Sequence, residues 1–342
     1  MSRFLEAAHR RPVDVTPVWL MRQAGRSLPE YRKLRERWKL VEIVAQPELC
    51  AEVTLQPVRR LGVDAAVMFA DIMLPLRGMG VEFELVEDVG PVIAHPIASA
   101  ADVDRLRVPA GDEAAPQVIS AVRQVVSESP VPVICFSGAP FTLASYLIEG
   151  RPSRDFLKVK TFMYTQPEAF DRLLTKLATT MAAYLRAQVA AGASAIQVFD
   201  SWVGALGRED YDIRILPHTR SLLADLATLS VPRIHFGTNT AGLLESIASA
   251  GPDIVSLDWR VPLDAGWSMI GHDRGVQGNL DPAVLLGPPD LVRERARDVL
   301  RRAGGRAGHI FNLGHGVHPS TPLENLQLLV ETVHEWQVAR VG

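Results

Sequence analysis

Two arginines lie four residues apart in an irregular segment near the start of the chain. Arg22 and Arg26 are the ends of the run Arg-Gln-Ala-Gly-Arg, which follows the apolar residues 18–21 and precedes Pro29. A guanidinium group binds a carboxylate or a phosphate through two parallel hydrogen bonds, so this loop can form an anion pocket. Exposed arginine is also common, and 31 of the 36 Lys and Arg residues are Arg. An anion pocket and a solvated turn both remain open at this point.

A carboxylate and an imidazole are further candidates. Asp71 follows the apolar residues 67–70, and an ionised carboxylate at the end of a buried strand needs N–H donors or a cation. Its structural alternative is to cap the following helix. His315 lies between two glycines, which leaves its ring accessible for chemistry or for a structural hydrogen bond.

Two hydroxyl groups are weaker candidates. Ser201 follows Asp200, but no Gly-x-Ser-x-Gly elbow surrounds it, so we expect a hydrogen-bonding wall and not a nucleophile. Tyr146 either offers its hydroxyl to a ligand or is a core aromatic residue.

Eight short apolar runs that end in polar residues or glycine must position these side chains. Such runs are typical of parallel strands buried on both faces, and the stretches between them include helical patterns at 170–190 and 291–303, each followed by glycine. This order predicts an α/β fold, a single-domain (β/α)8 TIM-type barrel over residues 1–342, with its site where the strands end. An open doubly wound sheet is the alternative, but no Gly-x-Gly-x-x-Gly follows the first run. The predicted strands are 18–21, 65–69, 131–136, 195–199, 233–236, 254–257, 275–277 and 309–312.

Composition excludes several classes of protein. The chain has 342 residues, 47% of them hydrophobic, and a formal net charge of −3, so no global field attracts nucleic acid or an anionic membrane. Residues 1–11 contain no apolar signal core, and the uncharged stretch 130–148 is interrupted by proline and glycine. These features predict a cytoplasmic enzyme.

No pattern predicts a metal or a cofactor. Cys50 and Cys135 are far apart in sequence and have no metal-ligand spacing, and His315 and His318 lack a third nearby ligand. None of the five lysines lies at the end of a predicted strand, which disfavours Schiff-base chemistry. Such a site suits a polyanionic substrate that supplies its own electron sink.

Five segments, in order, resemble the motifs of the uroporphyrinogen decarboxylase family. They are Pro-Val-Trp-Leu-Met-Arg-Gln-Ala-Gly-Arg-Ser-Leu-Pro-Glu-Tyr-Arg at 17–32, Phe-Ala-Asp-Ile at 69–72, Ile-Cys-Phe-Ser-Gly-Ala-Pro-Phe-Thr at 134–142, Phe-Asp-Ser at 199–201 and Asn-Leu-Gly-His-Gly at 312–316. The resemblance implies a homodimeric, cofactor-free (β/α)8 barrel. It also implies an activity in haem and porphyrin biosynthesis, in which the four acetate side chains of uroporphyrinogen III are decarboxylated to the methyl groups of coproporphyrinogen III.

The resemblance also implies roles for individual residues. Asp71 and Arg22 would be catalytic, with Asp71 accepting hydrogen bonds from pyrrole N–H groups and stabilising a cationic ring. The first proton would come from Arg22, or from a water or substrate carboxyl that it holds. The residues expected to contact substrate are Arg22, Gln23, Ala24, Gly25, Arg26, Arg35, Asp71, Tyr146, Ser201 and His315.

Two alternatives belong to other classes. Barrel methyltransferases with a His-x-Cys zinc motif resemble this family, but here the corresponding stretch is His-Phe-Gly at 235–237, and no cysteine follows Cys135. A non-catalytic porphyrin carrier is the other alternative.

Overall fold

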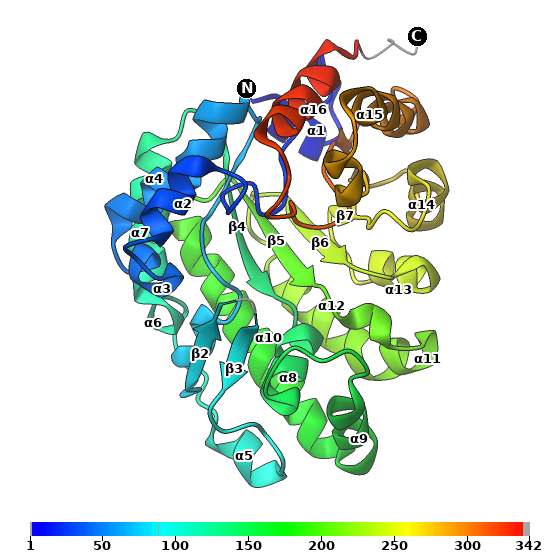
Figure 1. Cartoon of the computed structure of the whole chain (residues 1–342). Coiled ribbons are helices and arrows are strands. Elements are labelled where there is room, and N and C mark those ends of the chain that lie inside the picture. Colours follow the sequence, from blue (N-terminus) through cyan, green and yellow to red (C-terminus); the bar gives the residue numbers. More distant parts are fainter. Residues whose placement is uncertain (1, 88, 338–342) are drawn as a thin grey trace.

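A parallel sheet curls through the centre of the molecule, and helices surround it in the computed structural model (Figure 1). The structure describes residues 2–87 and 89–337. Within them the sheet has seven strands in the order β1-β4-β5-β6-β7-β8-β9, all paired in parallel. Its strands are β1 (Ala66–Val67), β4 (Val133–Gly138), β5 (Ala195–Asp200), β6 (Arg233–Gly237), β7 (Ile254–Ser256), β8 (Gly275–Gln277) and β9 (His309–Ile310). A separate antiparallel hairpin pairs β2 (Phe83–Val86) with β3 (Gly90–Ile93).

Helices connect each sheet strand to the next, which is the alternation expected of a (β/α)8 barrel. The α-helices are α1 (Arg3–Ala8), α2 (Pro29–Arg35), α3 (Leu40–Val44), α4 (Pro47–Leu61), α5 (Ala100–Arg105), α6 (Gly111–Ala114), α7 (Pro116–Glu128), α8 (Pro140–Glu149), α9 (Leu157–Thr165), α10 (Pro167–Ala190), α11 (Arg208–Asp210), α12 (Leu216–Asp225), α13 (Leu244–Ser249), α14 (Leu263–Ile270), α15 (Pro289–Ala303) and α16 (Leu323–Glu335). Shorter helical turns are η1 (Leu74–Arg77), η2 (Val203–Ala205), the π-helical η3 (Tyr211–Ile215), η4 (Ala241–Leu243) and η5 (Pro282–Leu286).

Seven of the eight predicted strands are confirmed, and the first is wrong as a strand. Residues 18–21 form only an isolated parallel bridge, between Val18 and Phe311. The backbone still joins both edges of the sheet, because the Phe311 N–H donates to Pro17 O (2.8 Å) and the Asp64 N–H donates to Val18 O (2.8 Å). Residues 17–23, the closing segment, therefore complete the barrel between β9 and β1. The predicted fold class is confirmed, whereas residues 1, 88 and 338–342 of the predicted domain lie outside the described residues.

Side chains replace the ladder hydrogen bonds that a regular first strand would make. The Gln23 amide accepts from the Leu20 N–H (2.9 Å) and donates to Ala65 O (3.0 Å). On the other side, Asn312 Oδ1 accepts from the Met21 N–H (3.0 Å). The backbone polar groups are satisfied without strand geometry, which frees the chain to turn immediately after Met21.

Two hydrophobic cores lie on the two faces of the curled sheet. Alternate strand residues such as Ala195 and Ile234 fill the barrel interior, whereas Ile196 belongs to the larger core shared with the surrounding helices. Phe4 and Ala7 of α1 join the interior core, so this helix closes the base, meaning the end where the strands begin. The sequence of residues 1–11 had shown only a polar segment.

Candidate active site

Candidate side chains from five separate connections meet at the rim, meaning the end where the sheet strands finish. Arg22 leaves the closing segment, Asp71 follows β1, Tyr146 lies on α8 after β4, and His315 follows β9. The charge of Arg22 acts on the pKa of each of the other three groups, and the charge of Asp71 acts on Tyr146. Ser201 follows β5 at the same end of the sheet. The structure thus brings Arg22, Asp71, Tyr146 and His315 together.

Arg22 occupies a backbone conformation that residues other than glycine seldom adopt, with φ of +60°. The turn after β9 packs closely against it, because a Cβ added to Gly316 would lie 2.5 Å from Arg22 Cδ. A Cβ on Gly25 would lie 3.0 Å from Arg22 O. Gly25 therefore lets this loop pack closely on itself. The strained backbone directs the guanidinium group from a fixed base.

Asp71 is half-buried and makes one local hydrogen bond. Its Oδ1 accepts from the Met73 N–H (2.9 Å), as in an Asx turn. Burial raises the pKa of Asp71, and the Met73 N–H and the Arg22 charge oppose that increase. No ion pair within 4.0 Å involves Asp71 in residues 2–87 and 89–337. This carboxylate is thus partly desolvated, has a raised pKa, and is available to a cationic or N–H-bearing ligand.

Tyr146 stacks on Trp202, with ring centroids 3.9 Å apart. Burial, followed by the Asp71 charge, raises the pKa of the Tyr146 hydroxyl, so it stays a hydrogen-bond donor at neutral pH. Ser201 is half-buried, and its carbonyl oxygen accepts a hydrogen bond from the Thr238 hydroxyl. The indole of Trp202 forms a wall of the site beside Tyr146.

A buried hydrogen-bond relay beneath this wall went unrecognised in the sequence. The Thr142 hydroxyl donates to Asp200 Oδ1 (2.7 Å) and accepts from the Trp202 N–H (3.2 Å). Asp200 is fully buried. The relay joins α8, which carries Tyr146, to the loop after β5. In Phe-Asp-Ser at 199–201, Asp200 is thus buried whereas Ser201 is half-buried at the rim. Asp200 lies between the sheet and α8 and positions the Trp202 loop through Thr142.

His315 lies on the turn that packs against Arg22, beside two aromatic rings. Its ring centroid is 6.3 Å from that of Phe236 and 6.4 Å from that of Trp259. Burial is the main cause that lowers the pKa of His315, the charges of Arg22 and Arg260 add to it and Asp258 opposes it, so that the pKa is about 4. The imidazole is therefore neutral at pH 7, with one donor and one acceptor nitrogen.

Three phenylalanines from neighbouring strands lie where the barrel interior meets the rim. Phe136 and Phe199 meet edge to face at 5.3 Å, and Phe199 meets Phe236 at 5.8 Å. Phe136 and Phe199 are only half-buried, so the site has an apolar aromatic floor. The strand alternation contained this information, because each of the three is the last apolar residue of its strand that points inward.

The remaining candidates lie at different distances from this centre. Gln23 is fully buried and holds the closing segment, and Ala24 packs against the outer core. Arg26 and Arg35 each form a long ion pair with Glu87, at 3.8 and 3.7 Å, next to the turn of the β2–β3 hairpin. Contact between any of the ten predicted site residues and a substrate stays a prediction.

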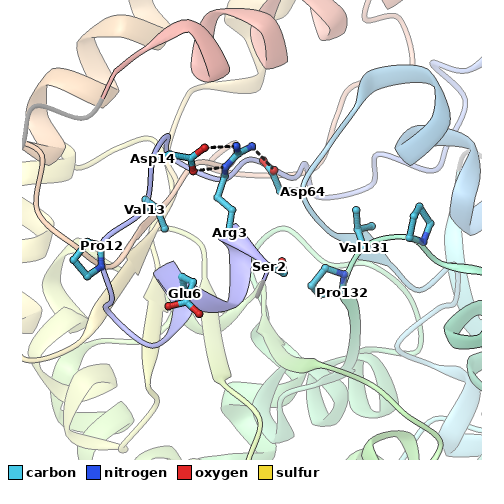
Figure 2. A pocket seen from close by; sticks show the side chains of 10 residues that line it. Ser2, Arg3, Glu6, Pro12, Val13, Asp14, Asp64, Val131 and Pro132 are labelled. Carbon is cyan, nitrogen blue, oxygen red and sulfur yellow. Dashed lines mark hydrogen bonds and ion pairs between the residues drawn. The ribbon is translucent and has the colours of Figure 1, made fainter.

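The base has a different character. A cavity of about 470 Å³ opens there beside α1, and Figure 2 shows Arg3 directed between Asp14 and Asp64. None of the predicted site residues lines it. Across residues 2–87 and 89–337, no group of three or more His, Cys, Asp or Glu side chains could hold a metal ion. No helix in the same ranges is long and apolar enough to cross a membrane.

The fold and the rim define a (β/α)8-barrel protein whose site combines an arginine, a desolvated carboxylate and an aromatic floor. Comparisons identify the particular family. The sequence model described as "Uroporphyrinogen decarboxylase (URO-D)" matches residues 1–336. Proteins named uroporphyrinogen decarboxylase are 52% identical in Carboxydothermus hydrogenoformans, over 97% of this chain and 95% of the relative, and 53% identical in Thermus thermophilus, over 97% of both. The chain belongs to the uroporphyrinogen decarboxylase family.

Solved structures of other proteins share the fold. A methyltransferase from Methanosarcina mazei has a TM-score of 0.83 at 23% identity, covering 97% of both chains. A B12-independent methionine synthase from Shewanella sp. W3-18-1 has a TM-score of 0.57 at 12% identity, covering 88% of this chain and 89% of its own. Barrel methyltransferases, the alternative drawn from the sequence, thus share the architecture of this chain.

Proposed function

We propose that the chain removes the carboxyl groups of the four acetate side chains of uroporphyrinogen III, giving coproporphyrinogen III and four CO₂ in haem and porphyrin biosynthesis. The observation that carries this proposal is Asp71, a desolvated carboxylate without an ion-pair partner among the described residues, beside Arg22 and above the aromatic floor. Membership of the family and relatives named for this activity support it. A macrocycle with carboxylate arms and pyrrole N–H groups complements each of these three features.

Each decarboxylation replaces a carboxylate by a proton. A proton added to a pyrrole carbon makes the ring cationic, and the C–C bond to the carboxylate then breaks. Its electron pair moves into the ring as CO₂ leaves, which gives a neutral ring with an exocyclic methylene. A second proton converts the methylene into a methyl group while the proton on the ring carbon is lost. The ring thus provides the electron sink that a cofactor would otherwise supply.

Asp71 stabilises the cationic ring in this scheme, because a fixed, desolvated carboxylate interacts strongly with charge that develops in the transition state. Its ionised form accepts hydrogen bonds from the pyrrole N–H groups. Tyr146 and His315, both neutral at pH 7, supply hydrogen bonds without adding charge. Arg22 binds a substrate carboxylate, and the first proton comes from Arg22 itself or from a water or carboxyl group that it holds. A guanidinium group is a weak acid, which favours the second source.

The proposal also covers where the chain works and how it assembles. The chain forms one domain over residues 1–342, works in the cytoplasm as a homodimer, and needs no nucleic acid or membrane. The family resemblance supports the dimer, and the net charge of −3 supports independence from nucleic acid. Sedimentation at micromolar concentration tests the assembly, and a monomer that retains full activity would contradict the dimer.

Anaerobic incubation with uroporphyrinogen III tests the activity. We expect intermediates with seven, six and five carboxyl groups, then coproporphyrinogen III, with CO₂ released in proportion. Tight binding of the macrocycle without CO₂ release would identify a carrier. Loss of activity on treatment with a chelator, and its return with zinc, would favour the methyltransferase chemistry that the sequence left as an alternative.

A further inference from the structure

Arg260 is held rigidly at the rim, in the loop that follows β7. The Arg260 guanidinium lies over the Trp259 ring, with Cζ 4.0 Å from the ring centroid. Its Nη1 donates to Asp258 Oδ2 (2.7 Å), and its backbone N–H donates to Asp258 Oδ1 (3.0 Å). The flat face and one edge of the guanidinium are thus fixed, so little rotamer entropy is left to lose when a ligand binds.

The ion pair with Asp258 leaves most hydrogen-bond donors of the Arg260 guanidinium available. The carboxylate is 1% exposed, and it also accepts a hydrogen bond from the Asn239 backbone N–H. Asp258 thus organises two loops of the rim. Arg260, by contrast, is 45% exposed and has five N–H donors on its guanidinium, of which the described residues use one. The remaining donors are available to an anion in the solvent-accessible rim.

The turn after β9 links Arg260 to the candidate site. A Cβ on Gly314 would collide with the backbone of Trp259, and a Cβ on Gly316 would collide with Arg22. His315 therefore lies on a turn that contacts Arg22 on one side and Trp259 on the other. Trp259, on which Arg260 stacks, lies 6.4 Å from His315 between ring centroids. Arg22 packs on the Gly316 side of this turn, and its charge acts on Asp71. Arg260 thus belongs to the rim site and lies across the His315 turn from Arg22.

Resting on the function proposed above, we propose that Arg260 binds a carboxylate of a propionate side chain of the tetrapyrrole, one that the reaction leaves intact. The reacting acetate has to lie near Asp71, where the cationic ring is stabilised, so a rigid cation farther along the rim serves a different arm. Propionates persist through all four decarboxylations. Arg260 then contributes to binding at every step and orients the macrocycle without taking part in bond breaking.

Kinetics with two substrates test this role. Arg260→Gln removes the charge, Arg260→Lys keeps it without the planar fork, and Arg301→Gln is the matched control. Arg301 is also an exposed arginine paired with an aspartate, Asp298 at 2.8 Å, but it lies on α15. KM and kcat are measured anaerobically with uroporphyrinogen III and with the pentacarboxylate porphyrinogen, at low and high salt, together with the melting temperature.

We expect Arg260→Gln to raise KM about tenfold for both substrates, the range of one charge-assisted contact, with kcat within about twofold of the unaltered chain. The increase should shrink at high salt, because screening already weakens the ionic contact in the unaltered chain. Arg260→Lys should recover part of the loss, and Arg301→Gln should change neither constant.

Three results would overturn the assignment. The first is an unchanged KM for Arg260→Gln, and the second is an increase confined to the octacarboxylate substrate, which would place an acetate at Arg260. The third is an equal fall in kcat for both Arg260 variants with a lower melting temperature, which would show a purely structural pair with Asp258. If the unaltered chain turns over neither substrate, the proposed function itself fails and this assignment fails with it.

Discussion

The two ends of the barrel hold the same kinds of charged residue in opposite arrangements. At the base, Arg3 pairs with Asp14 (2.6 Å) and with Asp64 (3.2 Å), and His334 Nε2 lies 2.8 Å from Asp64 (Figure 2 shows the Arg3 pairs). At the rim, Arg22 and Asp71 act on each other through space, but no hydrogen bond or ion pair within 4.0 Å joins them among the described residues. Charges that satisfy one another stabilise a fold, whereas charges held apart remain available to a ligand.

The base also supports the rim. Asp64 accepts a hydrogen bond from the Val18 N–H (2.7 Å), at the start of the closing segment that ends in the strained turn of Arg22. Asp64 thus anchors the segment at the base, whereas Asp71 lies at the rim beyond it. Asp64 and Asp71 are the same residue type and differ in the groups that bind them. Matched substitutions at the base and at the rim therefore separate effects on stability from effects on catalysis.

The largest difference should come from the two aspartates. Asp71→Asn keeps the shape of the side chain and removes its charge, so we expect turnover of uroporphyrinogen III to fall by about 10² to 10³ through lost stabilisation of the cationic ring. Asp64→Asn should retain kcat and lose about 2 kcal/mol of stability in chemical denaturation, because three hydrogen-bonding partners are weakened. Near-normal turnover by Asp71→Asn would show that Asp71, the carboxylate without an ion pair among the described residues, is not the catalytic one.

The two arginines should differ in their effect on pH dependence. Burial already raises the pKa of Asp71, and the Arg22 charge opposes this, so Arg22→Gln raises that pKa further. Because the proposed mechanism uses the ionised carboxylate, the acidic limb of log kcat against pH should move to higher pH, on top of a lower maximal rate. The same substitution raises the pKa of His315 from about 4, which acts in the same direction.

Arg3→Gln is the control at the base, and it should leave the acidic limb unmoved. A limb that stays in place in Arg22→Gln, or that moves to lower pH, would contradict the electrostatic coupling between Arg22 and Asp71. The measurement needs rates across the acid range with the folded fraction checked at each pH, so that unfolding is not taken for titration.

A smaller effect should follow from the relay beneath the rim. Thr142→Val removes the donor to Asp200 and the acceptor for the backbone N–H of Trp202. We expect kcat/KM to fall about tenfold, or about 1.4 kcal/mol, because two buried hydrogen bonds of about 1 kcal/mol each are lost and part of that loss reaches the site. Thr142→Ser should restore most of it. Thr332→Val is the matched control, because that buried hydroxyl donates to Leu328 O (2.7 Å) on α16, away from the site. Equal kcat/KM for Thr142→Val and the unaltered chain would rule out a positioning role for the relay.

The smallest effect should arise at the outer edge of the base. His334→Gln weakens one partly exposed contact with Asp64, so it should cost about 1 kcal/mol of unfolding free energy at low salt, less at high salt, and leave KM and kcat unchanged. A kinetic change in this variant would mean that the two ends are energetically coupled. In that case the contacts of Asp64 at the base would affect catalysis at the rim through the closing segment.

Much of the barrel could be predicted from the sequence because burial on both faces leaves a clear trace in single strands. The short, mostly apolar runs at 195–199 and 275–277 predict strands, and the structure has β5 and β8 there. The closing segment looked like another strand at 18–21, since its apolar residues are equally buried. Several of its backbone N–H groups donate to side chains, to the nearby Gln23 and to the distant Asp64 and Asn312, and pattern alone cannot identify the distant partners.

The site was less predictable for a similar reason. Residues that follow strands, such as Asp71 and His315, could be placed on one rim by topology alone. The roles of Thr142 and Asp200 depend on a contact between two elements, and Arg260 was one arginine among 31. What distinguishes it is its stacking on Trp259 and its link to Asp258, both of which are properties of packing.

The closing segment has a consequence for the order of events during synthesis. Met21 in the first loop of the rim is held by Asn312, 291 residues later in the chain. At about 5–20 residues per second, a ribosome needs about 15–60 s to reach that asparagine after it has made Met21. Throughout that time the Met21 N–H, which begins the strained loop of Arg22, lacks its acceptor Asn312. A nascent or truncated chain that ends before residue 312 therefore has an open barrel, and the site that we propose for the tetrapyrrole is complete only after residue 312 has left the ribosome.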